Sequence, residues 1–385
     1  MTSIGSPFLS LSGAVDSAAA DAGVPAHYGN PVAEQRALLA GAIVDLSHRG
    51  VISVSGADRL SWLNSLTSQS LTGLLPGQST ESLLLGVSGR VEFDMRVVDD
   101  GDTTWLLVDA DELPGLHAWL LKMRFTLRVV VTDRSAEFAT LGSIGASNEA
   151  LDAVAASPNG VALVWRDPWA TVSEGGHQYA RVAEHPGAEW LWRETLVSRD
   201  LLGALAGRIR GGEVSAAGIL AAEALRIAAW RPRRATEGDE KTIPHELDWM
   251  RSAVHLSKGC YRGQETVAKV HNLGHPPRRL VFLHLDGTDN VLPAPGDQVV
   301  LPAQADAAAP DEPDVVGQVT SSGIHYELGP IALAVVRRST PVEPDLGVLS
   351  DGIVVAAGQE VIVPPEAGSV IGRVRRMPRL GVMRR

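Results

Sequence analysis

The sequence changes character near Arg279, and this change limits the folds that the chain can adopt. Before it, strand-like and helix-like patterns alternate without a repeated parallel unit, which indicates a mixed α+β domain. After it, short strand-like runs are separated by Gly, Pro and Asp, which predicts a small β-barrel or sandwich. These runs cover residues 280–285, 298–301, 315–321, 331–336, 353–355, 360–363 and 370–375.

The length of the chain also requires more than one hydrophobic core. A single core stops growing at roughly 250–300 residues, and the chain has 385. We expect a weakly ordered lead-in at residues 1–27, a first domain at 28–278 and the β-barrel domain at 279–385. Within the first domain, the patterns predict an antiparallel meander at residues 82–108 and a helix at 194–207.

The only cysteine, Cys260, stands in the stretch Lys-Gly-Cys-Tyr-Arg-Gly-Gln-Glu at residues 258–265. Gly259 allows the backbone to turn sharply or to approach a ligand closely. Lys258 and Arg262 place positive charge beside the sulfur, which favours the thiolate over the thiol. A lone cysteine is also often a small buried apolar residue. The residues alone leave both interpretations open.

The stretch at residues 258–265 resembles the signature of the YgfZ family, folate-binding relatives of the glycine-cleavage T-protein (GcvT). Residues 45–50 and 317–334 resemble segments of the GcvT proteins. The resemblance implies a GcvT-like folate-binding domain of mixed antiparallel sheets and helices, followed by a small C-terminal β-barrel. It also implies tetrahydrofolate or another reduced folate as cofactor, and a role in maintaining iron–sulfur enzymes and in tRNA modification.

The resemblance gives roles to the residues of the motif. Cys260 is the expected reactive group, and Lys258 is expected to favour its thiolate form, so that alkylation is faster than that of a free cysteine. The residues of the motif that are expected to contact the cofactor are Tyr261, Arg262, Gln264 and Glu265.

An acidic residue that contacts the pterin ring is expected further upstream. In GcvT relatives, a leucine–arginine pair similar to Leu225–Arg226 opens a loop that carries a folate-contacting glutamate. Counting along this loop gives Glu237, with Glu240 as the alternative. A carboxylate suits a pterin because it accepts two parallel hydrogen bonds from the amino group and a ring nitrogen.

The strand at residues 91–98 carries the pair Phe93–Asp94. The resemblance aligns this pair with an Asp-Asp pair that contributes to aminomethyl transfer in GcvT enzymes. Asp94 is therefore a candidate for cofactor binding. Phe93 removes one of the two carboxylates, and a Phe–Asp pair can do less acid–base chemistry than two carboxylates. We therefore expect no aminomethyltransferase activity in the glycine-cleavage reaction.

The net charge of −11 argues against stable nucleic-acid binding, which requires a surplus of Lys and Arg. Eleven cationic residues nevertheless fall between Arg226 and Arg279. They are either a local positive field for an anionic small molecule or a solvated face. The sequence shows no signal peptide and no stretch long enough to span a membrane, so we expect a cytoplasmic protein without membrane contact.

No metal site is expected. A single cysteine excludes an intramolecular disulfide and a cluster held by four cysteines of one chain. His271 and His275 lie four residues apart, but Gly274 and Pro276 disfavour a helix that would present both to one metal ion.

Three functions are consistent with the sequence. The first is a tetrahydrofolate-binding factor of the YgfZ type that supports iron–sulfur enzymes, which would be its protein partners. The second is a folate-dependent aminomethyltransferase or methyltransferase. The third is a non-catalytic folate-binding scaffold in which Cys260 is structural. Replacing Cys260 by alanine separates the first from the third, and a glycine-cleavage assay tests the second.

Overall fold

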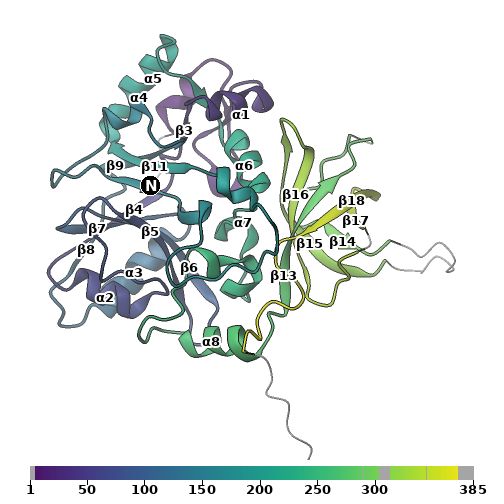
Figure 1. Ribbon diagram of the computed structural model, residues 1–385. Helices are drawn as coiled ribbons and strands as arrows, with labels where there is room; N and C mark the ends of the chain where they lie inside the picture. Colours follow the sequence, from purple (N-terminus) through teal and green to yellow (C-terminus); the bar gives the residue numbers. More distant parts are fainter. Residues whose placement is uncertain (1–4, 289, 303–312, 344, 372–385) are drawn as a thin grey trace, which may run out of the picture.

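The structure, a computed structural model, describes residues 5–288, 290–302, 313–343 and 345–371. A larger α+β domain and a β-barrel lie side by side, with helix α6 (Ile219–Ala228) between them (Figure 1). This arrangement confirms the predicted fold class. No helix in the described ranges has the length and apolar character needed to cross a bilayer.

The first sheet of the larger domain has the strand order β10-β11-β9-β3-β12. Its neighbouring strands are antiparallel, except that β12 pairs with β3 in parallel. The strands are β3 (Ile43–Asp45), β9 (Phe138–Ile144), β10 (Val164–Arg166), β11 (Trp192–Ser198) and β12 (Ala216–Ala217).

The second sheet has the order β5-β6-β7-β4-β8 and is antiparallel throughout. Strands β5, β6 and β7 pair consecutively, which confirms the predicted meander. The strands are β4 (Gly50–Ser55), β5 (Ser79–Leu85), β6 (Val91–Asp99), β7 (Thr103–Val108) and β8 (Val130–Asp133).

The two sheets share a core, and helices cover their other faces. The shared core includes Leu196 of the first sheet and Leu107 of the second, and Leu225 of α6 closes it. Its apolar burial is the main driving force for joining the two sheets. Between Pro31 and α6 the helices of this domain are α1 (Pro31–Leu39), α2 (Arg59–Leu66), α3 (Leu113–Met123), α4 (Glu149–Asp152), α5 (Leu202–Arg210) and the 3-10 helices η3 (Pro168–Ala170), η4 (Pro186–Glu189) and η5 (Arg199–Leu201).

The helix predicted at residues 194–207 begins instead as a strand. Residues 192–198 form β11, which pairs with β9 on one side and β10 on the other, and α5 starts only at Leu202. The prediction was wrong because tertiary pairing overrides helix propensity in this segment.

The N-terminal segment is folded from residue 5 onward, although we expected residues 1–27 to be weakly ordered. It contains η1 (Pro7–Ser10), β1 (Val15–Asp16), η2 (Ala19–Asp21) and β2 (Pro25–His27). Strand β1 pairs with β2, and the side chain of Phe8 is fully buried against α5. The small residues of this segment suggested weak order, but they surround Phe8, a large apolar side chain whose burial attaches the segment to the domain.

After α6 the chain crosses toward the barrel through short helices and then reaches the cysteine motif. These elements are α7 (Arg234–Glu237), η6 (Pro244–Leu247), η7 (Trp249–Arg251) and α8 (Gln264–Leu273). The motif runs from the loop between η7 and α8 into the first turn of α8, and Gly263 has the positive φ of 81° with which this loop enters the helix. A side chain at Gly263 would be strained there, and its Cβ would lie only 2.6 Å from the carbonyl oxygen of Gly86.

The C-terminal domain is a closed six-stranded antiparallel barrel of order β13-β16-β15-β14-β17-β18. One of its strands, β17, was not predicted. The prediction of a strand at residues 370–375 is wrong for Val370 and Ile371, which lie in a turn. Residues 372–375 are outside the described ranges. The strands are β13 (Arg278–Leu285), β14 (Gln298–Val300), β15 (Val315–His325), β16 (Gly329–Arg337), β17 (Leu346–Ser350) and β18 (Ile353–Val361).

Candidate functional site

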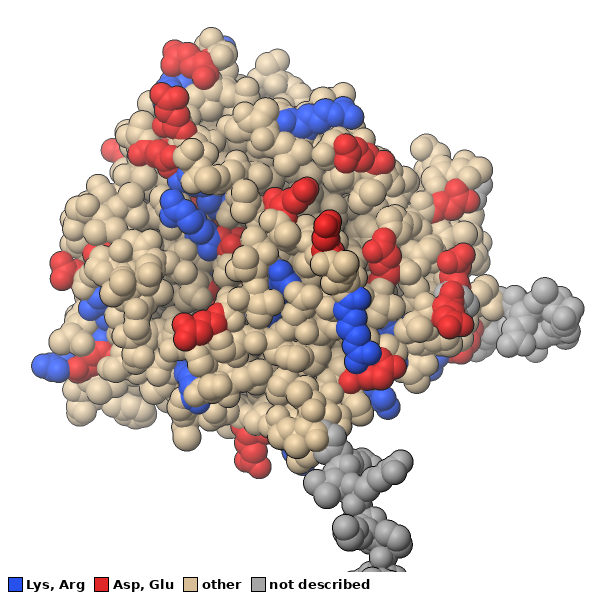
Figure 2. All heavy atoms as spheres, in the orientation of Figure 1, with Lys and Arg blue, Asp and Glu red and all other residues tan. Residues whose placement is uncertain are grey.

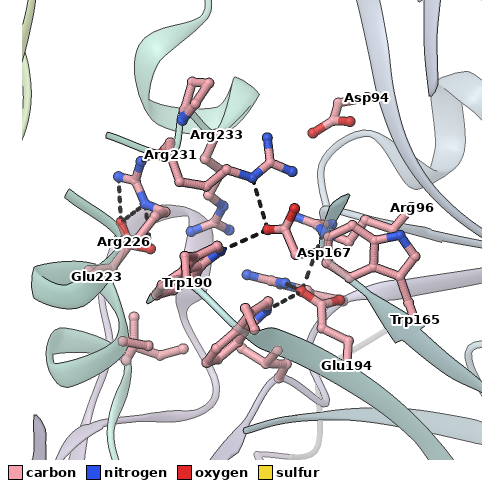
Figure 3. Close-up of a pocket in the computed structure, with 16 residues that line it drawn as sticks. Asp94, Arg96, Trp165, Asp167, Trp190, Glu194, Glu223, Arg226, Arg231 and Arg233 are labelled. Carbon is pink, nitrogen blue, oxygen red and sulfur yellow. Dashed lines mark hydrogen bonds and ion pairs between the residues drawn. The ribbon is translucent and has the colours of Figure 1, made fainter. Parts of the chain in front are cut away.

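A pocket opens between the two sheets, where α6 and the segment after it cover their edge (Figure 3). Strands β6, β10 and β11 supply its walls. Its charged and aromatic lining consists of Arg49, Asp94, Arg96, Trp165, Asp167, Trp190, Trp192, Glu194, Glu223, Arg226, Arg231 and Arg233.

Most of the charged groups in the pocket are paired with one another. Arg49 Nη1 lies 2.5 Å from Glu194 Oε1, and Arg96 Nε lies 3.3 Å from the same oxygen. Arg233 Nε donates to Asp109 Oδ2 over 2.9 Å. Although burial opposes ionisation, Arg233, Arg96 and Arg49 hold the pKa of Asp109 well below its usual range. Removing one partner would leave a buried charge uncompensated, which is costly. The pairs therefore hold the side chains that line the pocket in place.

Asp94 is the exception among these groups. Its side chain is buried, its Oδ1 has no hydrogen-bond partner, and no described residue forms an ion pair with it. Figure 3 accordingly shows no dashed line that reaches it. Burial, reinforced by the nearby Glu81, raises the pKa of Asp94 to about 7. A carboxyl group with this pKa can hold or release a proton near neutral pH.

A second unpartnered group lines the same pocket. Arg231 donates from Nε to Asp167 Oδ2 over 2.9 Å and from Nη2 to Glu81 Oε1 over 2.5 Å. Its Nη1 is buried and has no hydrogen-bond partner among the described residues. The pocket therefore contains a free acceptor on Asp94 and a free donor on Arg231. A ligand that carries both an N–H group and an acceptor would satisfy the two together.

Aromatic side chains give the pocket flat apolar surfaces. The rings of Trp190 and Trp192 stack with their centroids 5.3 Å apart and an interplanar angle of 10°. Trp190 donates from Nε1 to Asp167 Oδ2 over 2.8 Å, so its ring is held in place. Flat apolar walls beside a few polar groups are typical of sites for a planar, polar ring system.

Glu237 lies outside this pocket. Its carboxylate is buried at the junction with the barrel, and donors of the protein surround both of its oxygens. Arg226 Nη1 and the backbone N–H of Arg233 donate to Oε2 over 2.9 and 2.7 Å. Ser321 Oγ, on β15, donates to Oε1 over 2.5 Å. With these oxygens occupied, Glu237 joins α6 and α7 to the barrel.

The alternative, Glu240, is exposed in a turn and does not line the pocket either. The glutamate of α6 that does line it is Glu223, whose two oxygens both accept from Arg226 Nε over 3.0 Å. The sequence contained a signal for this pair, because Glu223 and Arg226 lie three residues apart on one helix face.

The side chain of Lys258 points away from solvent and is tied to the backbone. Its Nζ donates to the carbonyl oxygens of Asn64, Thr67 and Gln69 over 2.7, 2.7 and 2.6 Å. Burial lowers the pKa of Lys258 to about 8, while the three carbonyl oxygens favour its charged form. An ammonium group has three donors, and here all of them are used. Cys260, two residues further, is exposed.

The other motif residues pack around this loop. Tyr261 is buried, with the ring centroid 5.2 Å from Lys258 Nζ, and burial raises the pKa of its hydroxyl. Gln264 Nε2 donates to the carbonyl oxygen of Lys258 over 3.2 Å, and Glu265 is exposed in the first turn of α8. Arg262 reaches Glu92 on β6, and no motif residue lines the pocket.

The motif and the pocket meet at strand β6. Arg262 Nη1 donates to Glu92 Oε2 over 2.8 Å, and its guanidinium lies 5.8 Å from the ring centroid of Trp119. Glu92 and Asp94 are two residues apart on β6, and Glu92 stands at a break in the pairing register between β5 and β6. Phe93 points to the face opposite that of Asp94 and packs against α3. Its identity therefore affects the pocket less than the sequence suggested.

Sequence reasoning identified Asp94 but missed Arg231, Asp167 and Glu194 as pocket residues. Glu194 gave no signal, because the sequence predicted a helix where β11 stands. Arg231 belongs to the cationic residues between Arg226 and Arg279, but only the fold brings it beside Asp167, which comes from another loop. Within the described residues, no group of three or more His, Cys, Asp or Glu side chains is arranged to hold a metal ion.

Comparison with known proteins agrees with this architecture. An aminomethyltransferase of Herpetosiphon aurantiacus is 25% identical over 268 residues, which cover 69% of this chain and 73% of that relative. An IBA57 homologue of Mycosarcoma maydis, a mitochondrial iron–sulfur cluster assembly factor, is 26% identical over 266 residues. The match covers 64% of this chain but only 58% of the Mycosarcoma protein.

Among solved structures, the glycine cleavage system aminomethyltransferase T of Bartonella henselae superposes with a TM-score of 0.69. The match covers 93% of this chain and 96% of that protein, at 20% sequence identity. The chain therefore has the fold of the glycine-cleavage aminomethyltransferases. No family model matches the sequence.

Proposed function

We propose that the chain binds a reduced folate, such as tetrahydrofolate, in the pocket around Asp94 and Arg231 and acts as a YgfZ-type factor. In this role it supports iron–sulfur enzymes, including those that modify tRNA. The similarity to an iron–sulfur cluster assembly factor supports this role, and so does the resemblance of residues 258–265 to the YgfZ signature.

The observation that carries the proposal is the unpartnered carboxyl group of Asp94. A buried acceptor without a partner costs about 1–3 kcal/mol, and the pocket gains this energy back when a ligand donates to Oδ1. A reduced pterin carries ring N–H groups and an amino group as donors, and a carbonyl oxygen that suits Arg231 Nη1. The stacked Trp190 and Trp192 provide flat surface beside these groups.

Calorimetry with tetrahydrofolate tests the proposal. Wild-type protein should bind, and Asp94→Asn should weaken binding about 10–100-fold, because a hydrogen bond to a charged group contributes roughly 1.5–3 kcal/mol. The matched control is Glu92→Gln, a change two residues away on β6 that removes only the charge facing Arg262. Absence of binding by wild-type protein, or equal loss in both variants, would show that the pocket is not the folate site.

The part played by Cys260 needs a separate measurement. If Cys260 is the reactive group, Cys260→Ala should keep folate affinity, since its side chain does not line the pocket, and should lose support of an iron–sulfur enzyme in cells. Unchanged support would favour the folate-binding scaffold.

A folate-dependent transferase is the second candidate, and a specific observation favours it. Asp94 has a pKa of about 7 and faces the pocket, so it can take up or release a proton beside a bound ligand. The similarity to an aminomethyltransferase points in the same direction. We nevertheless expect no turnover with glycine-cleavage partners, and turnover at the rate of a glycine-cleavage aminomethyltransferase would overturn that expectation.

A further inference from the structure

A surface at the far edge of the second sheet combines exposed apolar side chains with cations. We call it the edge patch. Phe125 is 77% exposed, Val130 56% and Leu127 43%. The patch lies on the end of α3, on the following loop and on β8, at the side of the domain opposite the barrel (Figure 1). It consists of Lys122, Arg124, Phe125, Leu127, Arg128 and Val130.

The loop that carries Phe125 is joined by Arg128 to Asp58, the residue before α2. Arg128 donates to Asp58 from its backbone N–H, over 2.9 Å, and from two guanidinium nitrogens, over 3.0 and 2.6 Å. Phe125 itself has a φ of +43°, a left-handed conformation that is unfavourable for a bulky side chain. The fold therefore presents an exposed aromatic ring in a strained conformation. Strain of this kind concentrates at binding sites, where it pre-organises a contact.

The edge patch is positively charged within a chain whose net charge is −11. No Asp or Glu occurs between residues 121 and 132, whereas three cations do. Lys122 and Arg124 are exposed, and neither forms an ion pair with a described residue. The space-filling view shows Lys and Arg side chains mixed with acidic ones elsewhere on the visible face (Figure 2). Two unpaired cations beside exposed apolar groups complement an acidic partner.

Strand β8 is the last strand of its sheet and pairs only with β4. Its outer edge therefore offers backbone N–H and C=O groups to an added strand. Val130, on β8, and the neighbouring Leu127 lie beside this edge and give apolar contact for its side chains.

We propose that the edge patch binds an acidic, extended segment of a partner protein, which adds to the sheet as a strand along β8. A polypeptide fits better than a lipid surface, because hydrocarbon would leave the edge N–H and C=O groups without hydrogen bonds. A second copy of this chain fits poorly, because a two-fold interface would bring the cations of the patch against themselves. This inference does not depend on the proposed folate function.

The first test measures strand addition with the full chain. The probe is a short fluorescein-labelled peptide of alternating valine and glutamate, and a valine–lysine peptide is the charge control. Anisotropy should show binding of the glutamate peptide only, and added salt should weaken it. A glutamate peptide with methylated backbone nitrogens should lose binding, because it cannot donate to the edge. Equal binding of the methylated and unmodified peptides overturns strand addition.

The second test reverses the charge. The double variant Lys122→Glu, Arg124→Glu should no longer bind the glutamate peptide and should bind the lysine peptide instead. A folding defect would not produce this exchange. Phe125→Ser should weaken binding of the glutamate peptide about tenfold, as loss of an exposed aromatic anchor does at interfaces. Val87→Ser is the matched control, since Val87 is 80% exposed but lies on the β5–β6 turn. Unchanged binding by the charge-reversed variant overturns the proposal.

The remaining alternative is a lipid surface. Sedimentation with phosphatidylglycerol vesicles, compared with neutral phosphatidylcholine vesicles, measures it directly. The proposal expects no Phe125-dependent sedimentation. If Phe125→Ser abolishes binding to anionic vesicles while the wild-type chain ignores the glutamate peptide, the patch contacts lipid and the proposal is wrong.

Discussion

The pocket and the cysteine loop use charged side chains in opposite ways. In the pocket, buried arginines and carboxylates neutralise one another, and a single carboxyl group, Asp94, is left without a partner. In the loop, the sulfur of Cys260 is exposed, while the cation of Lys258 is committed to three backbone carbonyl oxygens. The free polar groups of the pocket therefore indicate where a ligand belongs. The charges beside Cys260 in the sequence mainly hold the loop to the domain.

Two buried carboxylates sharpen this comparison. The carboxyl group of Asp94 forms no hydrogen bond with a described residue, whereas that of Glu237 accepts hydrogen bonds from α6, α7 and the barrel. Both residues were expected to contact the cofactor. Their surroundings divide them into a group that is available to a ligand and a group that stabilises the junction between the two domains.

The largest expected effect is on stability at Glu237. Glu237→Ala leaves Arg226 with one carboxylate partner in place of two and removes the acceptor that joins α7 to β15. We expect the free energy of unfolding to fall by about 3–5 kcal/mol, as when one partner of a buried ion pair is removed. Urea unfolding measures this change. The control, Glu240→Ala, alters an exposed residue and should change stability by less than about 0.5 kcal/mol.

Folate binding by a Glu237 variant also tests the comparison between Glu237 and Asp94. If Glu237 orients the pterin, as the resemblance implies, Glu237→Gln should weaken folate binding by about 1–3 kcal/mol in protein that remains folded. We expect a smaller loss than in Asp94→Asn, because Glu237 does not line the pocket. A greater loss at Glu237 would mean that the folate lies at the domain junction.

The next effect is a gain of stability at Asp94. Burial raises its pKa from the ordinary 3.8 to about 7, so the folded state holds a proton that the unfolded state releases. Stability is therefore lost as the pH rises between about 4 and 7. Asp94→Asn cannot ionise and should stabilise the ligand-free protein at pH 8 by roughly 2–4 kcal/mol. Urea unfolding at pH 4 and pH 8 checks the sign, because the gain should disappear at pH 4.

The sequence predicted the architecture better than the site. The barrel was recognisable because short strands separated by Gly, Pro and Asp dominate the chain after Arg279. Strand β17 was missed because Gly347 and the preceding Pro and Asp residues hide its alternation. The first domain was harder, because β11 is buried on both faces and carries Arg193 and Glu194, which periodicity alone does not assign to a strand.

The site could be predicted only where local sequence determines it. Asp94 was found because β6 is a regular strand and the resemblance aligned one position. The partners of the arginines lie far away in the sequence, as Arg231 and Glu81 show with a separation of 150 residues. Such pairs depend on tertiary packing, so no local pattern contains them. The direction of the Lys258 side chain is also not predictable from the sequence. Its acceptors are backbone carbonyl oxygens, which every residue provides.

The smallest expected effect concerns the rate at which Cys260 is alkylated. This rate distinguishes two roles for Lys258, which are to anchor the loop or to activate the thiolate. If Lys258 chiefly anchors the loop, Lys258→Met should lower the free energy of unfolding by about 1–2 kcal/mol through its lost hydrogen bonds. The rate of Cys260 alkylation by iodoacetamide should then change by less than about fivefold, because the sulfur is exposed to water, which screens its interaction with Lys258 to roughly 0–1 kcal/mol. If Lys258 instead activates the thiolate, the rate should fall further while stability hardly changes.

Arg262 provides the matched comparison for this measurement. It is also two residues from Cys260, but it pairs with the half-exposed Glu92 and lies near Trp119. Arg262→Met should therefore cost less stability than Lys258→Met and leave alkylation similar, because the pair near the surface is weaker. Cys260 is exposed, so it should be alkylated in native protein under both substitutions. A thiol that stays unreactive even at high pH would rule out the reactive-cysteine mechanism and leave the folate-binding scaffold as the better account.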